Sequence, residues 1–318
     1  MGRKRNVYFY SGIEHAEDGT VKNWTEKRWT EFLDSLYGHP ETIRVRGFDL
    51  TGTCDECVSP ALRYLHFTRA RALSDWPESG DFSGNVENLA QRRRQAGINS
   101  ILEYSYLLPV SGTRYVAVVR SSGGPRSTAI GDWIALQKNF ALVGVDFELV
   151  PALSEDAYEK LNSAVGVKSI DIRYEGAPDG IDSKSDIERA VAMAGAALGE
   201  RDSVNASIEL SISLGNCKVT GPATDGIQRQ LHRLASSVNL VKSKKDAPLG
   251  SVSRLRAMTM QSRDDGTFYS EPVDFVKEQI TIQADFGDAP EVAMDPGKIL
   301  DGMLDAIRKF RERRRDAR

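Results

Sequence analysis

The chain has 318 residues, of which 40% are hydrophobic and 27% charged, and its formal net charge is −3. This length suggests about two domains, and this composition is typical of a globular protein rather than a disordered or fibrous one. No run approaches the roughly 18 consecutive apolar residues of a membrane span, and the apolar residues 7–10 are too few for a signal-peptide core. Three cysteines cannot all pair with one another, so we expect a reducing compartment and a cytoplasmic protein without direct membrane insertion.

The first half of the chain predicts strands interspersed with short helices. Its β-branched and aromatic segments predict strands at residues 6–10, 42–50 and 62–71. Residues 25–38 predict an amphipathic helix whose apolar face carries Trp29, Phe32, Leu33 and Leu36. A hairpin follows over residues 100–122 with its turn at Ser111 and Gly112, and then a helix through Trp133, a strand over 142–150 and a helix opened by Ser154.

Between these elements, residues 74–97 are polar and contain several glycines. A loop of this length inside a compact domain is usually functional or mobile. We expect this flap to be mobile or to cover a binding surface, with three arginines at its base.

The second half predicts strands at 166–176, 204–214, 251–263 and 277–287, a helix at 182–200, and a hairpin turn at 264–266. Residues 204–214 alternate strictly between apolar and polar side chains, and 277–287 repeat the pattern. Such alternation indicates antiparallel strands with one solvated face. We therefore predict an α+β fold with mainly antiparallel sheets covered on one face by helices. We place an N-terminal domain at residues 1–164 and a C-terminal domain at 165–318, ending in a long basic helix.

The last helix combines an apolar stripe with a strongly basic end. Asp295 is suited to cap it and Pro296 to its first position. The stripe comprises Ile299, Leu300, Met303, Leu304, Ile307 and Phe310. Residues 308–318 contain seven basic and two acidic side chains, a net charge of +5 that leaves −8 for the rest of the chain. A solvated helix end is one interpretation, because the helix dipole favours cations at this end. The dipole would be complemented by about two or three cations, so the excess leaves nucleic-acid contact by an end that projects from the body as an equal second interpretation.

Smaller basic clusters lie elsewhere in this acidic chain, and contacts to phosphates alone would be indifferent to base sequence. The nucleic-acid contacts expected from these clusters and from the last helix are Arg92, Arg93, Arg94, Lys242, Lys244, Lys245, Arg254, Arg256, Arg311, Arg313, Arg314, Arg315 and Arg318.

Catalytic signatures are weak. Cys54 and Cys57 have C-x-x-C spacing, but no second ligand pair with motif spacing completes a zinc site, which favours two ordinary strand cysteines. Gly123 and Gly124 precede a helix without the spacing of a phosphate-binding loop, which favours a plain turn before a capped helix. The sequence carries no enzyme signature, and we expect no cofactor and no metal; whether the N-terminal domain is catalytic stays open.

Residues 99–318 resemble the family of the lambda phage Rex exclusion protein A and related phage-defence proteins. The resemblance lies in the run "SILEYSYLLPVSGTRYVAVVRSSGGPRSTAIGDWI", the later "VGVKSIDIRYEG" and "GSVSRLRAMTMQSRDDGTFYSEPVDF", and the basic C-terminal helix. It implies a cytoplasmic homodimer that binds double-stranded DNA without sequence preference in an abortive-infection type of antiviral defence. It also implies a membrane-protein partner encoded nearby. The N-terminal part, with its C-x-x-C pair and its flap, departs from the family pattern.

Two alternatives remain open. A metal-dependent nuclease effector could use Asp146 and Glu148, which lie two residues apart on a predicted strand. A protein-binding adaptor could instead direct its arginines at an acidic partner, without nucleic acid.

Overall fold

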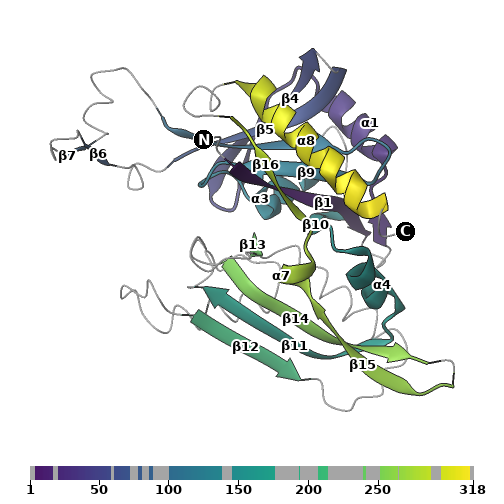
Figure 1. Cartoon of the computed structure of the whole chain (residues 1–318). Coiled ribbons are helices and arrows are strands. Elements are labelled where there is room, and N and C mark those ends of the chain that lie inside the picture. Colours follow the sequence, from purple (N-terminus) through teal and green to yellow (C-terminus); the bar gives the residue numbers. More distant parts are fainter. Residues whose placement is uncertain are drawn as a thin grey trace.

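The computed structural model describes residues 4–16, 21–58, 61–71, 78–80, 86–88, 100–137, 145–175, 193, 207–213, 239–240, 251–263, 265–287 and 295–315. Within these residues the strands form a nine-stranded sheet, a five-stranded sheet and a small separate hairpin (Figure 1). The described pairings are antiparallel, except for a short parallel contact between β13 and β14 and an isolated parallel bridge between Tyr37 and Cys54. The predicted α+β class with mainly antiparallel sheets is confirmed.

The first sheet has the order β10-β1-β9-β8-β5-β4-β3, and β16 and β2 also pair with β1. Its strands are β1 (Lys4–Ala16), β2 (Val21–Asn23), β3 (Glu41–Val45), β4 (Phe48–Val58), β5 (Ala61–Ala70), β8 (Leu102–Pro109), β9 (Tyr115–Arg120), β10 (Val145–Pro151) and β16 (Thr281–Asp285). The long strand β1 organises the sheet. One of its edges pairs with β9, while its other edge pairs first with β16 and then with β10.

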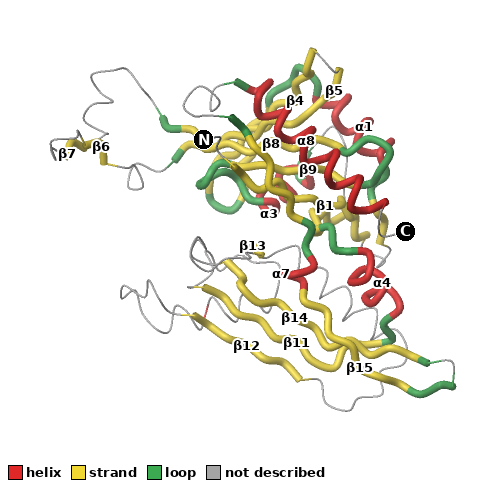
Figure 2. Tube along the Cα trace, viewed as in Figure 1, coloured by secondary structure: helices red, strands yellow, loops and turns green. Residues whose placement is uncertain are grey.

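Helices cover both faces of this sheet (Figure 2). Helices α1 (Glu26–Leu36) and α3 (Ser127–Ala135) share one apolar core with one face, and α8 (Pro296–Arg315) shares a second core with the opposite face. The residues of β9 from Tyr115 to Val119 are buried without alternation, as expected of a strand between two cores. Helices therefore cover both faces of this sheet, whereas the sequence predicted that they would cover one face.

The second sheet has the order β12-β11-β14-β13, with β15 also paired to β14. Its strands are β11 (Gly166–Glu175), β12 (Ser207–Ser213), β13 (Asn239–Leu240), β14 (Ser251–Ser262) and β15 (Phe268–Asp274). One face packs in a third core with α4 (Glu155–Ser163) and α7 (Phe275–Glu278). The predicted alternation holds along β12, where exposed side chains alternate with partly buried ones such as Ile208 and Leu210.

The predicted second domain does not extend to the end of the chain. The start of β1 pairs with β16, and α8 packs against β1, β8, β9 and β16 rather than against the second sheet. The apolar stripe of α8 needs an apolar surface to bury it, and the sequence pattern could not show which sheet supplies that surface. The second sheet is therefore inserted between two parts of the first.

Two segments of the chain connect the sheets, and these segments are hydrogen bonded to each other. Leu153 and Gln279 form an isolated antiparallel bridge. The amide of Ile280 donates to the carbonyl of Ala152 at 2.8 Å, and the amide of Ser154 donates to the carbonyl of Glu278 at 2.9 Å. These bonds make a short two-stranded neck between the sheets.

Some predicted elements fall outside the described residues. Of the predicted flap, the structure describes only a two-stranded hairpin, β6 (Glu78–Gly80) and β7 (Val86–Asn88), so its mobility stays a prediction. The helix predicted at 182–200 also lies outside them, apart from Met193.

Close packing between α3 and the first sheet generates a stability prediction. A Cβ atom at Gly52 would lie 2.5 Å from Cζ2 of Trp133, which is fully buried. We expect Gly52→Ala to lower the free energy of unfolding by about 1–3 kcal/mol, because the indole must shift within a packed core. Urea denaturation followed by circular dichroism measures this change.

Gly131→Ala is the matched control on the same interface. Its Cβ would have its nearest neighbour at 3.6 Å, an ordinary contact, and alanine has the higher helix propensity by roughly 1 kcal/mol. We expect this variant to be as stable as the parent or more stable. Equal midpoints for Gly52→Ala and the parent would contradict the described packing of Trp133 on β4.

Candidate nucleic-acid interface

The basic end of α8 is fixed to the first sheet. The stripe packs on the sheet, with Leu304 partly buried. The residues of α8 that are buried between helix and sheet are Ile299, Leu300, Met303, Ala306, Ile307 and Phe310. The ring of Phe310 stacks on Phe9 of β1, with centroids 4.1 Å apart and planes 8° apart, and Tyr115 of β9 packs edge-on against it at 5.4 Å. The last turns of α8 therefore lie against the turn between β8 and β9.

At this turn two guanidinium groups converge on Tyr115. Arg114 donates to the Tyr115 hydroxyl from Nη2 at 3.1 Å, and Arg314 donates to the same oxygen from Nη1 at 2.5 Å. Their Cζ atoms lie 5.2 and 4.8 Å from the centroid of the phenol ring, within range of a cation–π interaction. One buried tyrosine thus orients two arginines from distant parts of the sequence.

Arg311 and Arg313 extend this cluster. Nη2 of Arg311 donates to the main-chain carbonyl of Ser111 at 2.6 Å. Arg313 is exposed, and within the described residues neither arginine makes an ion pair. The acceptor of Arg311 is neutral, so its positive charge is not compensated by a carboxylate there.

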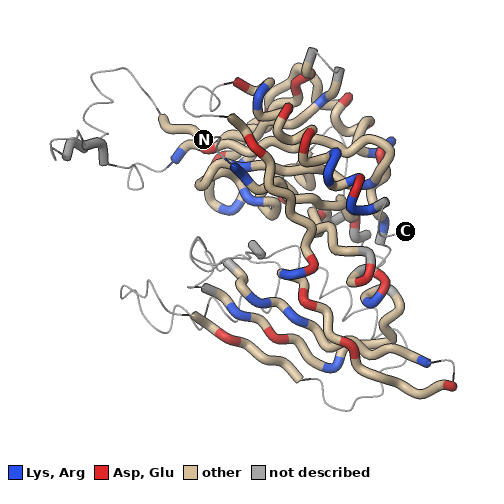
Figure 3. Tube along the Cα trace, viewed as in Figure 1, with Lys and Arg blue, Asp and Glu red and all other residues tan. Residues whose placement is uncertain are grey.

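Closer to the middle of α8, two cations share one carboxylate instead. Arg308 and Lys309 bond Asp305 at 2.5 and 2.6 Å. The hydrogen bond from Lys309, reinforced by that from Arg308, lowers the pKa of the Asp305 carboxyl, which therefore stays ionised. The helix is divided into a paired segment and a basic end, toward which its Lys and Arg positions gather in Figure 3.

The expectation that the basic end projects from the body is wrong for Arg311 and Arg314, which contact the β8–β9 turn. Arg114 was not among the predicted nucleic-acid contacts. Its position directly after a hairpin turn carried no signal, because only the packing of α8 brings the helix to that turn. We call Arg114, Arg311, Arg313, Arg314 and Arg315 the arginine cluster; for Arg315 the structure describes the backbone alone.

Arg254 and Arg256 do not join this cluster. Both lie on β14 in the second sheet, where carboxylates of β12 and β15 lie near them (Figure 3). Arg254 lies 3.9 Å from Glu209, which also binds Arg173 at 2.9 Å, and Arg256 lies 2.8 Å from Asp274. These cross-strand pairs make the two arginines weak candidates for phosphate contact.

The remaining predicted contacts, Arg92, Arg93, Arg94, Lys242, Lys244, Lys245 and Arg318, lie outside the described residues.

The glycine pair before α3 is explained by packing. A Cβ atom at Gly124 would lie 2.1 Å from the carbonyl oxygen of Tyr104, and one at Gly123 would lie 2.8 Å from the carboxyl carbon of Glu103. The plain turn that was predicted here is therefore a turn pressed against β8. The predicted cap is not formed, because Arg126 at the N-cap position makes no side-chain capping bond.

The two candidate metal sites gain no support from the geometry. Cys54 packs in the core beneath α1 and α3, while Cys57 packs against the core beneath α8, because an odd spacing on β4 places them on opposite faces. On β10, Glu148 is partly exposed and the side chain of Asp146 is not described. No group of His, Cys, Asp and Glu among the described residues is arranged to hold a metal ion.

No protein-family model matches this chain, and comparison with curated proteins finds no similar sequence. None of the described helices combines the length and the apolar character needed to cross a bilayer.

The placement of Cys54 leads to a reactivity prediction. Burial raises the pKa of its thiol to about 12, so near neutral pH the thiol is protonated and not nucleophilic. In a Cys57→Ser/Cys217→Ser variant, we expect iodoacetamide at about pH 8 to leave the folded protein unmodified and to alkylate it fully in urea. Intact-mass spectrometry measures both states, and rapid alkylation of the folded variant would contradict the described burial.

Proposed function

We propose that the protein binds double-stranded DNA without sequence preference through the arginine cluster at the end of α8. The observation that carries this proposal is the way the cluster is held. Arg311 is oriented by the main-chain carbonyl of Ser111, which is neutral and occupies only part of the donor capacity of a guanidinium. Other N–H groups of Arg311 can therefore meet a phosphate in the bidentate geometry that phosphates accept.

Fixed arginines lose less side-chain entropy on binding than mobile ones. Arg114 and Arg314 are held against the ring of Tyr115. This ring is buried at the start of β9 and packs edge-on against Phe310. The cluster is therefore preorganised, which favours contact with a regular phosphate backbone. Contacts to phosphates position a protein on DNA but carry no base information.

The acidic remainder of the chain restricts where DNA can bind. The chain is negative overall, Arg308 and Lys309 of α8 share Asp305, and Arg256 on the second sheet pairs with Asp274. We therefore expect binding at this end of α8, at low salt, with a steep salt dependence.

The wider role rests on the resemblance to the Rex exclusion protein A family. On that basis we propose a cytoplasmic, homodimeric DNA-binding component of an anti-phage, abortive-infection type of system, with a membrane-protein partner encoded nearby. The similarity in element order and in the basic C-terminal helix supports this role.

The proposal is tested by the salt dependence of binding to a fluorescent duplex, measured by anisotropy. Five phosphate contacts give a slope of log affinity against log salt of about −4 to −5, since each contact contributes roughly 0.9. We expect Arg311→Ala/Arg313→Ala to reduce the steepness of this slope by about 2 and to weaken binding on all duplexes alike.

Arg254→Ala/Arg256→Ala is the matched control, because it removes the same charge from arginines that are paired with carboxylates. We expect its slope to match that of the parent. The proposal fails if both double variants behave like the parent, or if affinity depends on the base sequence of the duplex. Tight binding to an acidic peptide with no binding to DNA would favour the adaptor instead.

A further inference from the structure

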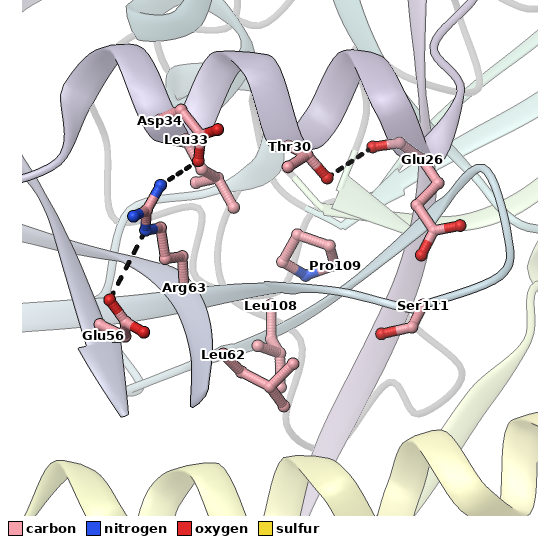
Figure 4. A pocket seen from close by; sticks show the side chains of 10 residues that line it. All are labelled: Glu26, Thr30, Leu33, Asp34, Glu56, Leu62, Arg63, Leu108, Pro109 and Ser111. Atoms are coloured by element: carbon pink, nitrogen blue, oxygen red, sulfur yellow. Dashed lines mark hydrogen bonds and ion pairs between the residues drawn. The ribbon is translucent and has the colours of Figure 1, made fainter. Parts of the chain in front are cut away.

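A cleft of about 300 Å³ lies beside the arginine cluster, on the side of α1 (Figure 4). It is bounded by α1, by the facing ends of β4 and β5, and by the end of β8. The residues that line it are Glu26, Thr30, Leu33, Asp34, Glu56, Leu62, Arg63, Leu108, Pro109 and Ser111. Ser111 is shared with the cluster, since its carbonyl accepts the hydrogen bond from Arg311.

The floor of the cleft is apolar. Leu33 and Leu108 are buried in the two cores of the first sheet, and Leu62 and Pro109 are partly exposed beside them. In Figure 4 the side chains of Leu62 and Leu108 lie together below Pro109. This surface offers contact to an aliphatic chain.

The rim of the cleft is acidic. Arg63 is bonded to Asp34 and lies 3.7 Å from Glu56, so one guanidinium is shared by two carboxylates. Glu26 makes no ion pair within the described residues, and Figure 4 shows its side chain extending from α1 toward Ser111. Three carboxylates against one arginine leave the cleft with a formal charge of −2.

The first-turn position of Glu26 complements the dipole of α1, which accounts for an acid there. It does not account for the apolar floor beneath the acid or for the charge of the cleft as a whole. A ligand that matches both has an aliphatic body and a cationic head. The volume lies at the lower end of the range for ligand pockets, which suits one side chain rather than a large molecule.

We propose that this cleft receives an arginine or lysine side chain presented by a basic segment of a partner protein. The aliphatic stem would lie along Leu62, Leu108 and Pro109, and the head would bond Glu26 and the carboxylates paired with Arg63. Apart from Ser111, the residues of the cleft are distinct from those of the arginine cluster. If the cleft did not bind a basic side chain, the proposed DNA binding would therefore be unaffected. A basic partner seated here would lie next to DNA bound on the cluster.

The test is a titration of the full chain with N-acetyl-arginine amide, with the leucine methyl groups labelled for NMR. The neutral isostere N-acetyl-citrulline amide is the matched probe. We expect the arginine probe to shift the methyl resonances of Leu62 and Leu108, but not those of Leu50, which is buried away from the cleft. We expect the citrulline probe to bind about tenfold more weakly, because it lacks the charge-assisted hydrogen bonds.

Glu26→Gln should weaken the arginine probe by roughly three- to tenfold, whereas Glu31→Gln should leave its affinity unchanged. Glu31 is on the same helix, is exposed, faces Lys27 and Arg28, and does not line the cleft. Methyl spectra of the free variants establish that both are folded. Two results would each overturn the proposal. One is equal binding of the two probes, and the other is an unchanged affinity of the arginine probe in Glu26→Gln.

Discussion

The stacking of Phe310 on Phe9 joins the last helix to the first strand, and much of the structure depends on this contact. It completes the core beneath α8, in which side chains of β1, β8, β9 and β16 meet the helix. Burying an aromatic pair of this kind contributes several kcal/mol, at the scale of about 3–5 kcal/mol for a phenylalanine removed from a core. The same contact sets the position of the helix end, and with it the arginines that α8 carries to the β8–β9 turn.

The neck between the sheets explains how one chain can build the first sheet from both of its ends. The chain leaves that sheet after β10, builds the second sheet, and returns through β16 within hydrogen-bonding distance of its exit. Tyr10 of β1 reinforces this region. Burial raises the pKa of its hydroxyl to about 12, despite hydrogen bonds with the side chains of Ser127 and Gln279, so it stays protonated. The bond to Gln279 thereby joins the neck to β1 through a partly buried tyrosine.

Positive charge has different consequences on the two sheets because its partners differ. On β14, Arg256 lies opposite Asp274 of the adjacent strand β15, and Arg254 lies 3.9 Å from Glu209 of β12, so carboxylates offset part of their charge. At the end of α8, the acceptor of Arg311 is a main-chain carbonyl, which orients a guanidinium without cancelling its charge. A count of basic residues treats the two groups alike, although their capacity to bind an anion is very different.

The sequence by itself determined the local elements. Helical periodicity located α1 and α8, a Ser-Gly pair located the β8–β9 turn, and Gly266, with φ at +77°, closes the predicted β14–β15 hairpin. Asp295 accepts a hydrogen bond from the amide of Gly297, in keeping with its predicted place at the start of α8. These features depend on interactions within a few residues, which a sequence pattern records directly.

Only the tertiary structure decided which surfaces meet. The apolar stripe of α8 indicates that the helix must pack on an apolar surface, but it does not indicate which of the two sheets supplies that surface. Arg114 joins the cluster because it follows the turn against which that helix ends. In the same way, β4 separates Cys54 from Cys57, and β14 aligns its arginines with acids on β12 and β15. Such contacts join residues far apart in the chain, and they follow from the shape and register of whole sheets rather than from any local pattern.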